Sequence, residues 1–109
     1  MTAQQIVASV LAFTRTWPAP KALWYVGITA DPIDCLTNRH QVKNPDTAMY
    51  FHALDEANAR AAEEELLTHG FDGDVGGGDN PTYVYVYLQI PPTKRAAVVL
   101  EAPTNPPVD

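Results

Sequence analysis

The chain has 109 residues, with 13 acidic and 7 basic side chains and a formal net charge of −6. This length is typical of one domain with one hydrophobic core, and the acidic charge argues against a protein that holds nucleic acid through a broad basic surface. No apolar stretch approaches the ~20 residues of a membrane-spanning helix. Residues 1–13 lack the pattern of a signal peptide, and the lone Cys35 is compatible with a reducing compartment, so we expect a cytoplasmic protein that does not bind membranes.

Helices and strands alternate along the predicted chain. Thr2 and Asp55 are suitable N-caps for two helices, and Asp31 followed by Pro32 begins a short one. Aromatic and β-branched runs such as ALWYVGIT and TYVYVYLQI indicate strands. We therefore expect helices at residues 2–14, 31–40 and 55–69, and strands at residues 22–29, 48–54 and 82–90.

This order, α-β-α-β-α-β, predicts an α+β fold for residues 1–90, with helices packed on a three-stranded, mostly antiparallel sheet. Residues 91–109 contain five of the ten prolines and are predicted to be a loosely attached tail. In the last strand Tyr83, Tyr85 and Tyr87 face one way. They either pack in the core, which we favour, or form an exposed row that stacks on bases or on a partner.

Residues 24–32 (WYVGITADP) carry the most specific motif in the chain. Tyr25, Val26 and Gly27 lie on a predicted strand that leads through a short turn into a helix. In these residues the chain resembles the second half of the GIY-YIG nuclease signature, and a weaker likeness covers residues 22–90. The resemblance implies the GIY-YIG fold and a nuclease that hydrolyses phosphodiester bonds with a divalent metal, Mg²⁺ or Mn²⁺.

The resemblance also implies roles for individual residues. Tyr25 matches the motif tyrosine near the attacking water, and Glu63 is the best match for the glutamate that holds the metal. His40 lies where related sequences often carry a histidine. The family's catalytic arginine would stand eight residues after Gly27, a position that Cys35 occupies here, and Arg39 is the candidate replacement on the same helix face.

Helical periodicity supports an inward position for Glu63 independently of the resemblance. Its side chain projects into the middle of the apolar stripe formed by Ala59, Ala62, Leu66 and Leu67. A buried carboxylate needs a partner, and the partner is either a metal ion or a group of the protein, such as Arg39 or a tyrosine hydroxyl. The seven cations are scattered, although folding could gather Arg39, Lys43 and Arg60 into one basic patch.

Two other groups have a chemical and a structural interpretation. Cys35 could act as a nucleophile with His40 or His52 as base, but a small buried hydrophobe is the favoured interpretation. Residues 70–81 contain three aspartates that could bind calcium, but their spacing does not follow the EF-hand pattern, so we expect a flexible glycine-rich loop.

The family's first motif, Gly-Ile-Tyr, is absent from this sequence. Tyr50, or a member of the row of Tyr83, Tyr85 and Tyr87, could replace its tyrosine in space. We therefore expect a degenerate GIY-YIG-like domain that binds a protein or nucleic acid without catalysis, with a metal-dependent endonuclease as the alternative.

Overall fold

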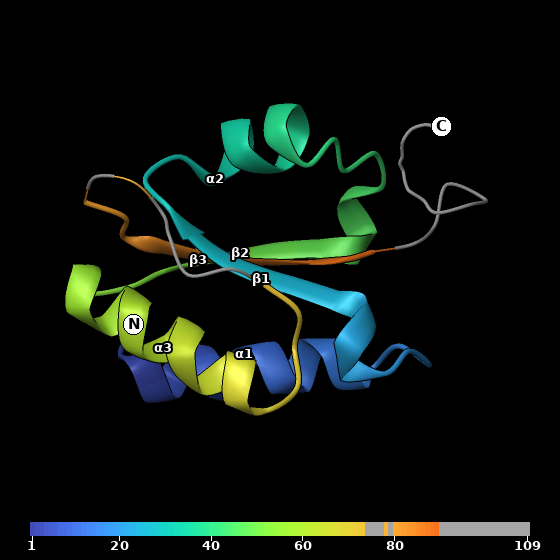
Figure 1. Cartoon of the computed structure of the whole chain (residues 1–109), viewed down its shortest axis with the longest axis horizontal. Coiled ribbons are helices and arrows are strands. Elements are labelled where there is room, and N and C mark those ends of the chain that lie inside the picture. The colour runs from blue at the N-terminus through green and yellow to red at the C-terminus, as the bar shows by residue number, and fades with distance from the viewer. Residues whose placement is uncertain (74–77, 79, 90–109) are drawn as a thin grey trace.

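The computed structural model describes residues 1–73, 78 and 80–89, in which helices and strands alternate as predicted (Figure 1). The predicted tail, residues 91–109, and much of the glycine-rich loop lie outside these residues. Within the described part, no helix has the length and apolarity needed to cross a membrane. The elements are α1 (Ala3–Arg15), β1 (Trp24–Thr29), α2 (Pro32–Asp34), β2 (Ala48–His52), α3 (Glu56–Thr68) and β3 (Tyr83–Leu88).

The three strands form one antiparallel sheet in the order β1-β3-β2. The predicted α+β class with a three-stranded sheet is confirmed, and the pairings between strands are antiparallel throughout. The last strand along the chain is therefore the central one. Gly27 lies opposite Tyr85, Tyr25 lies opposite Tyr87, and Tyr85 lies opposite Tyr50 on the other side.

Local capping explains where the two long helices begin. The hydroxyl of Thr2 accepts a hydrogen bond from the Gln5 amide at 3.2 Å, and the Gln5 side chain accepts one from the Thr2 amide at 2.9 Å. This reciprocal pair is a capping box that satisfies amides at the helix start. At the start of α3, the Asp55 side chain accepts a hydrogen bond from the Asn58 amide, and Gly70, with φ of 102°, ends this helix. The predicted caps are confirmed.

Several predicted boundaries differ from the observed ones by one or two residues at strand ends, and the strand predicted at residues 48–54 ends at His52. Two further boundaries are wrong for local reasons. The first strand begins at Trp24 because Lys21–Leu23 form a 3-10 turn instead of extended chain. The helix expected to reach His40 is α-helical only to Asp34 and continues as a π-helical turn, Cys35–Arg39. The His40 amide donates to the Cys35 carbonyl at 3.0 Å, which closes this wider turn.

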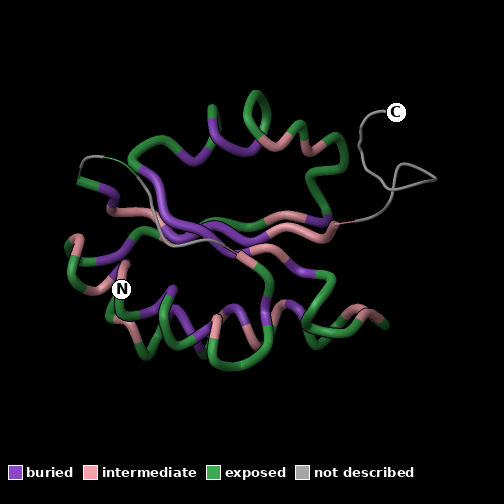
Figure 2. The backbone as a smooth tube through the Cα atoms, in the orientation of Figure 1, coloured by how far each residue is buried: buried purple, intermediate pink, exposed green. Residues whose placement is uncertain are grey.

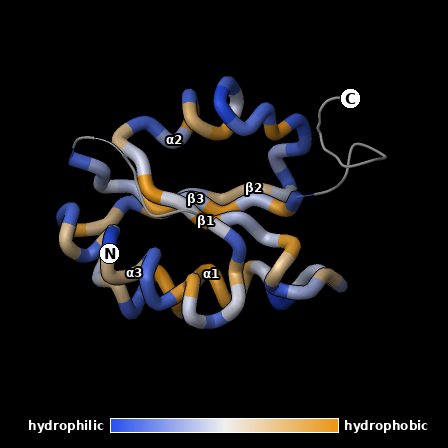
Figure 3. The backbone as a smooth tube through the Cα atoms, viewed as in Figure 1, coloured by the Kyte–Doolittle hydropathy of each residue, from blue (hydrophilic) through white to orange (hydrophobic). Residues whose placement is uncertain are grey.

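Helices α1 and α3 cover one face of the sheet, and α2 with its π-helical turn lies over the other (Figure 1). Buried residues follow the strands and the sides of α1 and α3 that face them (Figure 2), and hydrophobic residues are concentrated in the same places (Figure 3). The main core combines residues of α1, α3 and the alternating positions of the sheet, namely Ile6, Val10, Trp24, Val26, Ile28, Leu66, Val84 and Val86.

The opposite face carries the tyrosines and forms a second, smaller core. Cys35, Leu36 and Tyr85 are buried there, with Tyr25 and Tyr87 packed against them. The prediction that the tyrosine row belongs to the core is confirmed for Tyr85, whereas Tyr83 and Tyr87 are half-buried. The alternation of β3 thus gives each face of the sheet its own set of side chains.

Candidate functional site

The four residues that the sequence singled out lie in two layers of the fold. Tyr25 and His40 meet on the tyrosine face, with ring centroids 5.0 Å apart. Arg39 is the last residue of the π-helical turn, immediately before His40, and it is exposed. Glu63 is buried on α3, in the layer that covers the valine face. The structure therefore brings together Tyr25 and His40, and it places Arg39 and Glu63 in different layers.

His40 is held between two tyrosine hydroxyls. Its Nε2 atom lies 2.8 Å from the hydroxyl oxygen of Tyr85, and its Nδ1 atom lies 2.9 Å from that of Tyr87. A neutral imidazole has one donor and one acceptor nitrogen, so one tyrosine donates to the ring and the other accepts from it. We call His40, Tyr25, Tyr85, Tyr87 and Cys35 the His40 cluster.

The strand register and one glycine explain how the His40 cluster forms. Tyr85 and Tyr87 project from the same face of β3 because their positions alternate, and Tyr25 of β1 lies directly opposite Tyr87. The ring of Tyr85 lies over Gly27, where the Cβ atom of any other residue would collide with it. Gly27 of the YVG motif therefore has a packing role, which is to leave space for Tyr85.

Burial keeps His40 and the two tyrosines that contact it uncharged. Desolvation, together with the smaller effect of the positive charge of Arg39, lowers the pKa of His40 from 6.5 to about 4. Burial likewise raises the pKa of Tyr85, helped by its hydrogen bond with the Cys35 thiol, and raises that of Tyr87. At neutral pH His40 is therefore an unprotonated imidazole and both phenols keep their protons.

Cys35 stands where the GIY-YIG resemblance would place an arginine, and it is only 2% exposed. It is the first residue of the π-helical turn and packs with Leu36 and Tyr85. His52, one of the bases considered for this thiol, is instead exposed and stacks on Tyr83 with ring centroids 4.4 Å apart. These contacts support the interpretation of Cys35 as a small buried side chain.

Glu63 has the inward position that its helix periodicity predicts and is 1% exposed. Its neighbours on the same face of α3 are Ala59, Ala62 and Leu66, which are also buried. Among residues 1–73, 78 and 80–89, no cluster of three or more His, Cys, Asp or Glu side chains is arranged to hold a metal ion. The proposed metal at Glu63 thus depends on the family resemblance.

The aspartates considered for calcium fall mostly beyond the described residues. Asp74 and Asp79 are outside them. The carboxylate of Asp72 accepts hydrogen bonds from the Gly73 amide at 2.9 Å and from the Gln89 side chain at 3.0 Å. These bonds tie Asp72 to neighbouring backbone and to the end of β3.

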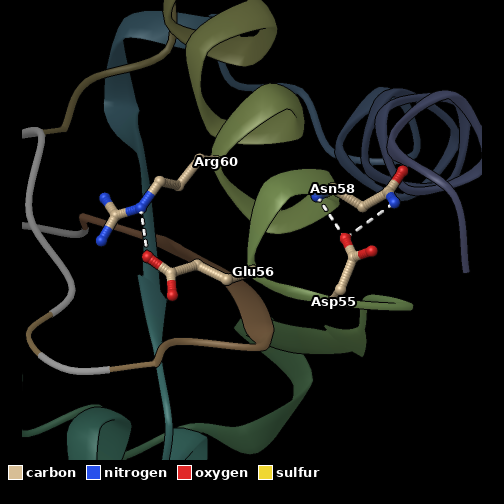
Figure 4. A network of polar contacts seen from close by, with 4 residues as sticks. All are labelled: Asp55, Glu56, Asn58 and Arg60. Atoms are coloured by element: carbon tan, nitrogen blue, oxygen red, sulfur yellow. Dashed lines mark hydrogen bonds and ion pairs between the residues drawn. The ribbon is translucent and has the colours of Figure 1, made fainter.

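The basic patch that folding could have formed is divided between the layers. Arg60 lies on α3, where its Nε atom donates to Glu56 at 2.7 Å (Figure 4). Arg39 and Lys43 lie in the segment that follows α2, over the tyrosine face. On the other side of the α3 start, Asp55 accepts from the amide and side chain of Asn58, and these bonds lower its pKa (Figure 4). The cations are therefore not gathered at the His40 cluster.

Tyr85 and Tyr87 also belong to the site. Their direct contacts with His40 were not predicted from the sequence. Their alternation in TYVYVYLQI was visible, but pairing of β3 with β1 was not. Compared with known proteins, the chain matches no family model, and no curated protein or solved structure shows significant similarity.

Proposed function

We propose that this chain is a GIY-YIG-like domain that does not cleave nucleic acid and acts by binding a protein with a basic surface. The YVG motif supports the family assignment, and a fold can persist without its original activity. The observation that carries the proposal is that both ring nitrogens of His40 are held by tyrosine hydroxyls. A general base or acid must instead reach the substrate or its attacking water.

The positions of the charged groups also support loss of catalysis. Phosphodiester cleavage needs positive charge where negative charge develops. Here the arginine position holds Cys35, which is buried, and Arg39 is exposed in the layer opposite that of Glu63. A metal on Glu63 and a cation on Arg39 would therefore act from different sides of the sheet.

The acidic charge of the chain supports a basic partner. The net charge of −6 favours encounter with positively charged surfaces through long-range attraction. On α3, Glu64 and Glu65 are exposed, while Glu63 of the same run is buried. The outer face of α3 is thus an acidic surface available to such a partner.

A metal-dependent nuclease is the second candidate, and one observation favours it. The ring of Tyr25 stacks with those of two further tyrosines, with centroids 6.3 Å from Tyr85 and 5.3 Å from Tyr87. Either one could stand in for the tyrosine of the missing first motif. Glu63 would then hold Mg²⁺ or Mn²⁺, and Arg39 or Lys43 would contact the phosphate.

Cleavage assays distinguish the two candidates. Purified protein is incubated with plasmid DNA, single-stranded DNA and RNA in the presence of Mg²⁺ or Mn²⁺, beside the variants Glu63→Gln and Arg39→Ala. Glu64→Gln, which changes an exposed neighbour by the same chemistry, is the matched control. We expect no cleavage by any of these proteins. Cleavage by the wild type and the control that both other variants lose would refute the proposal and establish the nuclease.

A separate measurement tests whether the chain binds a protein with a basic surface. A partner captured on the immobilised protein is identified, purified and titrated against the wild type at increasing salt concentrations. Because screening weakens attraction between exposed charges, we expect the dissociation constant to rise with salt. An affinity that does not change with salt would contradict a basic partner surface.

A further inference from the structure

The outer edge of β2 differs from the outer edge of β1. Along β1, the backbone of Asp72 covers the edge: the Val26 amide donates to the Asp72 carbonyl at 2.8 Å, and the Asp72 amide donates to the Trp24 carbonyl at 2.9 Å. Strand β2 lies at the other side of the sheet, next to β3 alone in the described strand order. Exposed strand edges present main-chain groups that can pair with another chain.

The ladder between β2 and β3 fixes which main-chain groups point outward. The Ala53 amide donates to the Thr82 carbonyl on the β3 side at 2.8 Å. Along an antiparallel strand, the amide and the carbonyl of one residue point to the same side, and successive residues alternate between the two sides. Met49 and Phe51 therefore direct their main-chain groups toward β3, whereas Ala48, Tyr50 and His52 direct theirs away from it.

Both ends of this outer edge are already occupied. The Ala48 amide donates to the Pro45 carbonyl of the preceding 3-10 turn. At the other end, the Met1 ammonium donates to the His52 carbonyl at 3.0 Å, and the Leu54 amide donates to the Met1 carbonyl at 2.9 Å. Four outward groups are left, and no residue of the described part pairs with them: the amides of Tyr50 and His52 and the carbonyls of Ala48 and Tyr50.

These four groups are complementary to an identical set. A twofold axis beside Tyr50 would pair the Tyr50 amide of each copy with the Tyr50 carbonyl of the other. The same axis pairs each His52 amide with the Ala48 carbonyl of the second copy. Four hydrogen bonds form in this way, every open group is used, and the occupied groups at the ends are not needed.

We propose that two copies of this chain associate through their β2 edges to form one continuous six-stranded antiparallel sheet. The side chains of the edge are suited to this contact. The strand Ala48–His52 (AMYFH) has no Asp, Glu, Lys, Arg or proline, the residues by which edge strands commonly avoid pairing. Met49 is 39% exposed and Tyr50 is 44% exposed. These side chains lie on opposite faces of the edge, and the two Tyr50 rings would become cross-strand neighbours.

A second copy is the proposed occupant because the four open groups match an identical set without a change of register. The net charge of −6 opposes association of two copies only weakly. The edge strand contributes no Asp, Glu, Lys or Arg side chain to the contact, and charges beyond about 8 Å are screened at physiological salt.

Sedimentation velocity over a wide range of protein concentrations tests this proposal. The full chain is compared with Tyr50→Pro, which removes the central amide donor, and with Tyr50→Lys, which places two like charges opposite each other. Ile33→Lys is the matched control, because it introduces the same charge at a residue of α2 that is 56% exposed. Circular dichroism checks that every variant is folded.

We expect the wild type and Ile33→Lys to dimerise as concentration rises, and the dissociation constants of both Tyr50 variants to rise about tenfold or more. NMR hydrogen exchange should show protection of the Tyr50 and His52 amides that increases with concentration. A wild type that stays monomeric, or a dimer insensitive to both Tyr50 variants, would overturn the proposal. Protection that is independent of concentration would also overturn it, because a segment of the same chain would then occupy the edge.

Discussion

Replacing His40 with glutamine tests whether its burial among tyrosines makes the fold sensitive to acid. His40 has a pKa of about 4 in the folded chain and an ordinary value of 6.5 when unfolded. As the pH falls through 6.5, the unfolded chain takes up a proton at this residue while the folded chain does not. Its contribution to stability is therefore complete above pH 6.5 and is lost between pH 6.5 and about 4.

The size of this loss follows from the two pKa values. Their separation sets an upper limit of about 3.4 kcal/mol. Because His40 is only half-buried, solvent reduces the effect, and we expect about 2 kcal/mol. The groups that face the imidazole are Tyr25, Tyr85 and Tyr87, and the charge that acts on it is that of Arg39.

Urea unfolding followed by tryptophan fluorescence gives the free energy of unfolding of the wild type and of His40→Gln at several pH values. Both chains carry His52 and His69, whose contributions cancel in the difference. The stability advantage of the wild type should shrink by about 2 kcal/mol as the pH is lowered from neutral to about 4. A difference that stays constant with pH, or a His40 resonance that titrates near pH 6.5, would refute the reasoning.

Two further predictions concern packing and use the same unfolding assay. Leu66→Ala removes a side chain with 0% exposure and should lower the free energy of unfolding by about 2–5 kcal/mol, whereas Leu54→Ala, at a residue that is 68% exposed, should change it by less than about 0.5 kcal/mol. Equal losses would contradict the assigned core. Gly27→Ala should destabilise the fold by about 1–3 kcal/mol, because its Cβ atom collides with the Tyr85 ring, and most of this penalty should disappear when Tyr85→Ala is also present. An undiminished penalty in the double variant would place the clash elsewhere.

Much of the secondary structure could be predicted because its signals are local. Thr2 and Gln5 form a capping box within four residues of chain, and Asp55 caps α3 through Asn58. The alternation of tyrosine and valine in β3 likewise determines the two faces of that strand. Signals of this kind need no knowledge of what lies elsewhere in the fold.

The candidate site was harder to predict because it depends on long-range pairing. The contact of His40 with Tyr85 joins residues that are 45 positions apart and forms because the π-helical turn before His40 packs on the tyrosine face of β3. The π-helical turn also alters the relation between Cys35 and Arg39, since a spacing of four residues brings side chains together on an α-helix. Periodicity placed Glu63 inward correctly but could not determine which face of the sheet its helix covers.

The central place of β3 has a consequence for how the protein is made. Strands β1 and β2 both pair with β3, which the ribosome completes after them. Until Tyr83–Leu88 has emerged, a nascent chain has neither sheet ladder, and the apolar side of α1 has no finished surface to cover. Sheet formation must therefore be a late step. Pairing of β3 with both other strands closes long loops, and the entropy cost of closing them favours slow folding. During that interval the unpaired strands are suitable clients for chaperones.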